Sequence, residues 1–176
     1  DVAIWLMNGT TIKSGGTVYS SLASSWQIKG VGDFDGDGKS DILFQHSSGD
    51  VVIWLMNGTT IKSIGTVYSS LASSWQIKGV GDFDGDGKSD ILFQHSSGDV
   101  VIWLMNGTTI KSIGTVYSSL ASSWQIKGVG DFDGDGKSDI LFQHSSGDVV
   151  IWLMNGTTIK SIGTVYSSLA SSWQIK

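Results

Sequence analysis

The sequence predicts an all-β protein, a β-propeller whose blades are near-identical four-stranded antiparallel sheets of 49 residues each. One observation is the repeat itself: shifting the chain by 49 residues superimposes it almost perfectly and places Asp33, Asp82 and Asp131 in one phase. A second is that each copy consists of short apolar segments separated by turns rich in glycine, asparagine and serine. Sheets that recur at this period and stack face to face are typical of propeller blades.

The repeat also predicts the domain organisation. We expect a single repeat domain over residues 1–176, with full repeats at 1–49, 50–98 and 99–147 and a partial repeat at 148–176. The departures between copies lie in the first one, where Ala3 stands against Val52 and Gly15 against Ile64. Such near-identity is expected from a recent amplification or from deliberate design, and the sequence leaves both open.

Four strands are expected in each copy, in the order A, B, C, D. Strand A is predicted at Trp75–Val80, before an aspartate-rich loop, and strand B at Asp41–His46 in the preceding copy, before the turn "SSGD". Strand C is predicted at Val51–Met56, and the hairpin signal "NG" then leads into strand D at Thr59–Ile64. The short connections imply an antiparallel meander, and Gly65–Ser74 forms a longer link to the next copy.

Strand C supports stacking of one sheet on the next. Its residues "VVIWLM" are apolar at every position, so both faces should be buried, one against the preceding sheet and one against the following sheet. A β-solenoid is the competing architecture, but parallel coils are shorter and lack tight hairpins. The "NG" turn therefore favours blades.

The loop between strands A and B predicts a calcium site in each full copy. In "DFDGDGKSD" the carboxylates of Asp33, Asp35 and Asp37 can point inward, with the Lys39 carbonyl and Asp41 completing the shell. Hard oxygen donors at this spacing select Ca²⁺ over zinc or copper. Without a cation the clustered carboxylates would repel one another. The equivalent candidate ligands in the other copies are Asp82, Asp84, Asp86, Lys88 and Asp90, and Asp131, Asp133, Asp135, Lys137 and Asp139.

Two other interpretations of this loop are less favoured. An EF-hand shares its first three ligands but needs a glutamate at position 12, where this chain has Phe44. A solvated Asp-Gly turn would explain one such segment, but not the same aspartate spacing three times. Because all copies are alike, we expect the ion to act as a structural staple rather than a regulator.

At this point the residues resemble a known family. The segments "GVGDFDGDGKSDILF" and "SSGDVVIWLMNGTTI" resemble the FG-GAP and VCBS-type repeat, whose loop is similar to the calcium-binding blades of integrin α-subunits. The resemblance implies a calcium-binding β-propeller in an extracellular or cell-surface protein with a glycan or protein ligand. The chain lacks a literal "FG…GAP" stretch, and "FQH" stands where bacterial relatives often carry tryptophan and arginine, which bears on the ligand-binding face.

Composition narrows the function classes further. The chain has no cysteine, which excludes disulfides and thiolate metal sites. Its net charge of −5 and single, scattered lysines argue against a nucleic-acid partner. The longest apolar run, "VVIWLM", is too short to insert into a membrane, and nothing at Asp1 resembles a signal peptide.

No enzymatic activity is expected. The histidines, one per full copy, are expected to be polar residues at the end of strand B, and no local combination of serine, histidine and acid stands out. The motif "NGT" matches an N-glycosylation sequon, but the hairpin turn explains the same letters. The histidines are His46, His95 and His144, and the sequons begin at Asn8, Asn57, Asn106 and Asn155.

Two sets of aromatic residues leave two interpretations open. One set begins strand A and the other lies in the preceding link. They either form shelves for sugar rings between blades or fill the core between blades. The residues are Trp26, Trp75, Trp124 and Trp173, and Tyr19, Tyr68, Tyr117 and Tyr166.

The predicted strands follow the order CD, ABCD, ABCD, ABCD and the start of another strand A. The strand edges at both ends would be unpaired and the apolar faces of the terminal sheets would be uncovered, which favours a homo-oligomer. The leading hypothesis is a calcium-binding propeller with a structural or adhesive, non-catalytic role, assembled from more than one chain. The alternatives are a multivalent glycan-binding lectin with one site per blade junction, and a designed or reconstructed symmetric scaffold without a natural ligand.

Overall fold

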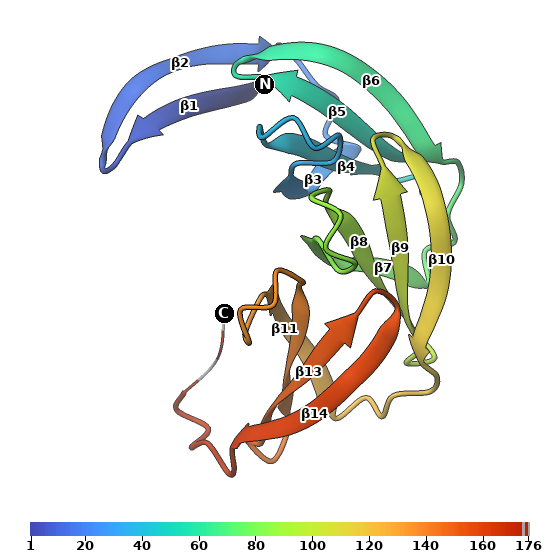
Figure 1. Ribbon diagram of the computed structural model, residues 1–176. Coiled ribbons are helices and arrows are strands. Elements are labelled where there is room, and N and C mark those ends of the chain that lie inside the picture. The colour runs from blue at the N-terminus through green and yellow to red at the C-terminus, as the bar shows by residue number, and fades with distance from the viewer. Residues whose placement is uncertain (174, 176) are drawn as a thin grey trace.

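The chain folds into a fan of antiparallel sheets (Figure 1). The structure is a computed structural model, and it describes residues 1–173 and 175. A two-stranded hairpin is followed by three four-stranded sheets, and each sheet is a meander in the order A, B, C, D. The fold class predicted from the sequence is therefore confirmed. No helix occurs among the described residues, so none is present there that could cross a membrane.

The strands repeat with the period of the sequence. The hairpin consists of β1 (Val2–Asn8) and β2 (Thr11–Tyr19). The first sheet contains β3 (Trp26–Gly32), β4 (Asp41–His46), β5 (Val51–Asn57) and β6 (Thr60–Tyr68). The second contains β7 (Trp75–Gly81), β8 (Asp90–His95), β9 (Val100–Asn106) and β10 (Thr109–Tyr117). The third contains β11 (Trp124–Gly130), β12 (Asp139–His144), β13 (Val149–Asn155) and β14 (Thr158–Tyr166).

The last strand of each sheet is longer than the sequence predicted. We expected strand D to end at Ile64 and the link to span Gly65–Ser74, whereas β6 continues to Tyr68. Gly65 does not break the strand, because it pairs with Ile53 on β5, and Tyr68 still pairs with Val51. The expected start of a further strand A at Trp173–Lys176 includes Gln174 and Lys176, which lie outside the described residues.

Apolar side chains from neighbouring sheets interlock to form the core. On β4 and β5, alternate residues face opposite neighbours: Phe44 and Trp54 pack against the hairpin, whereas Leu43 and Ile53 pack against the second sheet. Strand β5 is buried on both faces, as its uninterrupted apolar sequence predicted. We call the face of a sheet toward its N-terminal neighbour the leading face, and the face toward its C-terminal neighbour the trailing face.

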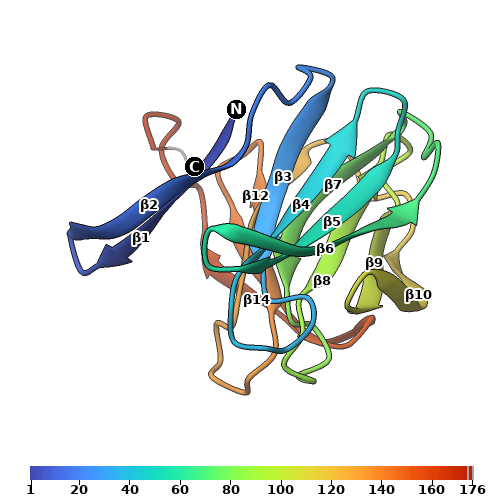
Figure 2. The ribbon, with the colours of Figure 1, turned by 90° about the horizontal axis from the view of Figure 1, so that it is seen from above.

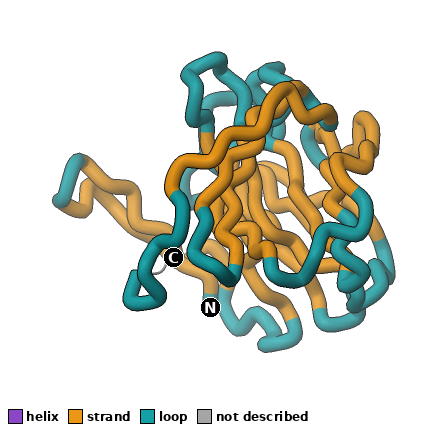
Figure 3. The backbone as a smooth tube through the Cα atoms, turned by 90° about the horizontal axis from the view of Figure 1, so that it is seen from below, coloured by secondary structure: helices purple, strands orange, loops and turns teal. Residues whose placement is uncertain are grey.

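The first strands of the three sheets lie closest together, since β3 contacts β7 and β7 contacts β11. Glycine makes this close approach possible. A Cβ atom added to Gly30 would lie 2.6 Å from Val80 Cγ2, and one added to Gly79 would lie 2.5 Å from Val129 Cγ2. The sheets therefore fan out from a line of closely packed inner strands (Figure 1). Figure 2 and Figure 3 show the same sheets from above and below.

Candidate metal centre

The aspartate-rich loops connect the first and second strands of each sheet, and every loop is wrapped around its first carboxylate. In the first loop, Asp33 Oδ1 accepts hydrogen bonds from the main-chain N–H groups of Gly36 (2.7 Å) and Asp37 (3.1 Å). Asp33 Oδ2 accepts a third from Gly38 N–H at 2.7 Å. Gly36 and Gly38 have φ angles of 77° and 81°, a conformation that glycine adopts without steric cost. This local geometry follows directly from the spacing of aspartate and glycine.

The loops gather their carboxylates closely enough to share one metal ion. In each group, one carboxylate oxygen from each of three aspartates lies within 4.8 Å of the others. The donor set is entirely hard oxygen, which suits a divalent cation of the calcium class. The groups are Asp33, Asp35 and Asp37; Asp82, Asp84 and Asp86; and Asp131, Asp133 and Asp139.

The fourth aspartate of each loop also accepts main-chain hydrogen bonds inside the protein. Asp41 is fully buried, and its carboxylate accepts main-chain N–H bonds from Phe34 (2.8 Å) and Met56 (2.7 Å). It thereby ties the loop to β5, the strand that pairs with β4. Burial raises the pKa of Asp90, its equivalent, to about 7, even though the same two kinds of hydrogen bond act to lower it. A bound cation would favour the ionised form.

A lysine that the sequence analysis missed lies against the same carboxylates. Lys62 Nζ is 2.7 Å from Asp35 Oδ2 and 3.2 Å from Asp37 Oδ2. Hydrogen bonds to the corresponding aspartates raise the pKa of Lys111, its equivalent in the second sheet. The lysine is a counter-ion for these oxygens. Because Lys62 lies on β6, far along the chain from its loop, only the meander brings the two together.

The loop backbone links one sheet to the next. Ser89 N–H of the second loop donates to the Asp33 carbonyl at 2.6 Å, and Gly107 N–H of the next hairpin turn donates to the Phe34 carbonyl at 2.8 Å. The Phe34 side chain, between two candidate ligands, is fully buried in the core between the sheets. A cation that orders the loop would therefore also order the contact between neighbouring sheets.

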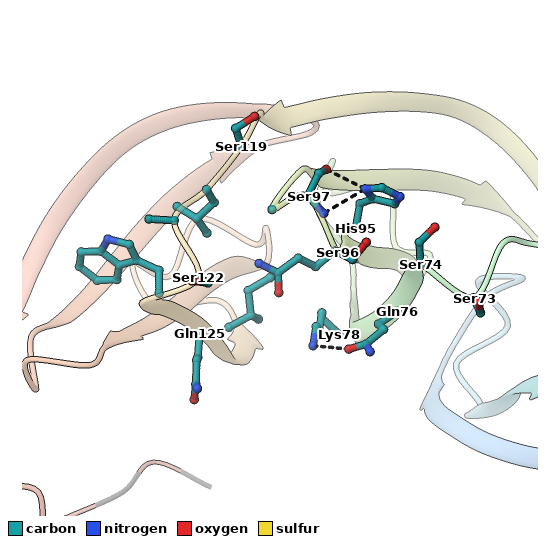
Figure 4. A pocket seen from close by; sticks show the side chains of 16 residues that line it. Ser73, Ser74, Gln76, Lys78, His95, Ser96, Ser97, Ser119, Ser122 and Gln125 are labelled. Carbon is teal, nitrogen blue, oxygen red and sulfur yellow. Dashed lines mark hydrogen bonds between the residues drawn. The ribbon is translucent and has the colours of Figure 1, made fainter.

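A polar groove recurs at the junctions between sheets, away from the metal loops. Figure 4 shows the copy between the second and third sheets, a groove of about 630 Å³. Its walls carry serine hydroxyls and the amides of Gln76 and Gln125, together with Lys78, His95 and Trp124. The copy between the first and second sheets has a volume of about 570 Å³ and contains Trp75 at the equivalent place.

Of the two interpretations of the aromatic residues, core packing holds for the tryptophans, because Trp26, Trp75 and Trp124 are partly buried against the apolar clusters between the sheets. The tyrosines pack elsewhere, because Tyr19 stacks on Trp54 of the following sheet with ring centroids 5.4 Å apart. Tyr68 and Trp103 repeat this pair at the next junction. Trp75 and Trp124 also border the copies of the groove. The tryptophans of strand A contact the strand-end histidines, with Trp26 and His46 centroids 4.7 Å apart.

The histidines belong to a hydrogen-bonded turn that joins a serine, a histidine and an aspartate, a local combination that the sequence did not make apparent. His46 Nδ1 lies 2.6 Å from Ser48 Oγ, which donates to Asp50 Oδ2 at 3.0 Å. Ser48 N–H also donates to His46 Nδ1 at 3.1 Å. The serine lies between the other two groups, whereas in a hydrolytic triad the histidine does. The network therefore holds the turn in an arrangement that differs from that of a hydrolytic triad.

The comparisons with known proteins agree with the loop geometry. A family model described as FG-GAP-like repeat matches residues 33–93 and again 82–142, which together span more than half of the chain. Each match begins at the first aspartate of a loop and ends in the second strand of the following sheet. A comparison with curated proteins finds no match.

Proposed function

Because this chain belongs to the FG-GAP-like repeat family, we propose that it is a calcium-binding repeat module with a structural or adhesive, non-catalytic role, which works as an assembly of more than one chain. The observation that carries the proposal is the position of the carboxylate groups in loops that also hydrogen-bond one sheet to the next. Calcium in each loop offsets the repulsion between carboxylates and stabilises the junctions. Extracellular calcium concentrations suit such exposed loops, so we place the protein outside the cell or at its surface.

The residues that would hold the ion are those of the aspartate groups, with the remaining aspartate and the lysine carbonyl of each loop completing the shell. The remaining aspartates are Asp41, Asp90 and Asp135. When bound, the ion supplies charge neutralisation and a fixed geometry for the loop. Calcium bound by these aspartates would take over the charge neutralisation that Lys62 and its equivalents provide in this structure.

Thermal unfolding in calcium and in chelator tests this role. Calcium should raise the melting temperature of the parent chain, because a ligand that binds only the folded state stabilises it by mass action. Replacing Asp35, Asp84 and Asp133 with asparagine should abolish that increase. The matched control replaces Asp50, Asp99 and Asp148, which lie outside the loops, with asparagine. This control should keep the calcium-dependent increase in melting temperature. An increase of equal size in both triple variants would refute the metal role.

A second candidate function is the binding of glycans at the sheet junctions. It is favoured by the recurring groove, where amides, hydroxyls and one tryptophan face the same space. Sugars are recognised by such combinations of hydrogen-bonding groups and an aromatic face. A glycan array in saturating calcium, with a Gln76→Leu and Gln125→Leu double variant as control, tests it. Absence of any signal from the parent chain argues against this candidate.

A further inference from the structure

The two ends of the fan expose faces that are buried everywhere else in the molecule. On the leading face of the hairpin, Trp5 is 68% exposed and Met7 is 52% exposed. Their equivalents in the first sheet, Trp54 and Met56, are 6% and 0% exposed, because the hairpin itself covers them. The leading face of the hairpin thus has the chemistry of a sheet junction without a partner.

The trailing face of the third sheet is its counterpart. Phe132 is 45% exposed, whereas Phe83, at the same place in the preceding repeat, is fully buried. Val165 is 59% exposed, whereas Val116 is half-buried and packs against the next sheet. The residues are identical in both cases, so the difference comes only from the missing neighbour.

We propose that these two faces bind each other between two copies of this chain, so that the trailing face of β11–β14 carries the hairpin β1–β2 of a second copy. This inference rests on the proposed multi-chain module and specifies its contact surface. The argument is continuity with an existing interface, because the chain already forms the same contact at its own junctions. The second copy repeats the part of that junction that the third and fourth strands form, because the hairpin consists of these two strands.

The internal junctions give the register of the contact, since three of their features have one half on each exposed face. In the first, a tyrosine stacks on a tryptophan of the following sheet, as Tyr117 does on Trp152 with centroids 5.3 Å apart. In the contact between two copies, Tyr166 of one copy therefore stacks on Trp5 of the second copy.

The second feature is a hydrogen bond between turn and loop. Gly156 N–H donates to the Phe83 carbonyl at 2.8 Å, and Gly107 N–H donates to the Phe34 carbonyl in the same way. By the same register, Gly9 N–H of the second copy donates to the Phe132 carbonyl.

The third feature is a threonine that covers a glycine. Thr157 packs on Gly114, and Thr59 lies 3.5 Å from the Cβ position of Gly16. The equivalent Gly163 has no atom within 4 Å of its Cβ position. Thr10 of the second copy fills that space.

A second copy, rather than the other end of the same chain, is the occupant, because the two faces lie at opposite ends of an open arc (Figure 1). The full sheets separate the hairpin from β14 in the fan. A contact between two different faces is heterologous, so it propagates until the assembly closes into a ring or continues as a ladder.

The two positions at which the first repeat differs in sequence from the others lie on the leading face of the hairpin. Ala3 stands in the place of the buried Val52, and Gly15 pairs with Trp5 in the place of Ile64. A Cβ atom at Gly15 would lie 2.7 Å from Trp5 Cδ1, so the ring occupies space that the isoleucine fills in the other copies. The contact between copies is therefore weaker than an internal junction, and an Ala3→Val, Gly15→Ile variant should bind at least several-fold more tightly.

Sedimentation velocity over a range of concentrations tests the surface. The parent chain in calcium should associate, and Trp5→Lys should remain monomeric with an unchanged circular dichroism spectrum. Ile64→Lys is the control, because Ile64 is 54% exposed even at an internal junction. A parent chain that is monomeric at all concentrations, or equal loss of association in both variants, would overturn the proposal. So would an Ala3→Val, Gly15→Ile variant that associates no more tightly than the parent.

Cysteine cross-linking tests the register, and the chain contains no cysteine of its own. Thr10→Cys and Gly163→Cys chains, mixed and oxidised, should form a disulfide-linked heterodimer. A mixture of Thr59→Cys with Gly163→Cys should not, because Thr59 already covers Gly16. Equal cross-linking in both mixtures refutes the register. If the double variant Thr10→Cys, Gly163→Cys closes within one chain, the second copy is not the occupant.

The same measurements separate this inference from the calcium role. They are repeated with the Asp35, Asp84 and Asp133 asparagine variant, because asparagine has nearly the size and shape of aspartate and Asp84 borders the turn at Gly156 of an internal junction. Association and cross-linking that persist there support the interface even if calcium does not bind. Calcium-dependent melting of a chain that stays monomeric supports the metal role alone.

Discussion

At the scale of single residues, one aspartate in each repeat holds a serine in a conformation that side chains rarely adopt. Ser119 has a φ angle of 54°, and its N–H donates to Asp99 Oδ1 at 2.8 Å. Asp50 makes the same bond to Ser70, whose φ angle is 56°. The hydrogen bond from Ser119 is the largest cause that lowers the pKa of Asp99. A charged acceptor thus stabilises the link between successive sheets.

The acid stability of the chain should depend on these aspartates. Their pKa is lower in the folded state than in the unfolded state, so their contribution is complete above the unfolded value of about 4 and is lost as the pH falls through the folded value. Replacing Asp50, Asp99 and Asp148 with asparagine should therefore reduce the loss of stability between neutral and acid pH. Urea unfolding at pH 7 and pH 3 in chelator measures it. An undiminished loss of stability would contradict the assignment.

At the scale of elements, the spacing between the inner strands depends on glycine. Strand β7 contacts β3 on one side and β11 on the other, and Gly79 leaves room for Val129. Gly128 on β11 is the same residue in the next repeat, but nothing lies within 4 Å of its Cβ position. The two glycines share their sequence context and differ only in whether a neighbouring strand is present.

This pair gives a matched test of packing. Gly79→Ala should destabilise the chain by about 1–3 kcal/mol, because the added methyl group collides with Val129 of the next inner strand. Gly128→Ala should change the stability by less than about 0.5 kcal/mol. Urea denaturation in dilute solution, where chains are separate, compares the two. Equal effects would mean that the inner strands do not approach as closely as described.

At the scale of the whole molecule, repetition produces one interface several times. The hairpin covers the first sheet, the first covers the second and the second covers the third, and loops hydrogen-bond successive sheets. Each sheet contacts its neighbours in the order of the chain, as expected for a repeat protein. Stability should therefore depend on junctions as much as on single sheets, which is why the proposed calcium sites and the proposed contact between copies both act there.

The period, the order of strands in each sheet and the loops in which aspartates gather could be predicted from the sequence alone. These features depend on local spacing, such as the "NG" turn at Asn57 and the placement of Asp33, Asp35 and Asp37 at every second residue. The length of strand D was not determined in this way, because pairing with β5 carries β6 past Gly65.

The burial and the contacts of each copy of the repeat depend on the tertiary structure. Phe83 is buried and Phe132 is 45% exposed although their neighbours in the sequence are the same. Lys62 reaches Asp35 only because β6 returns beside the loop. Identical local sequences carry no information about which neighbour covers them. Burial, ion pairing and the exposed faces follow from the positions of the sheets in the fan, since they depend on contacts between distant segments.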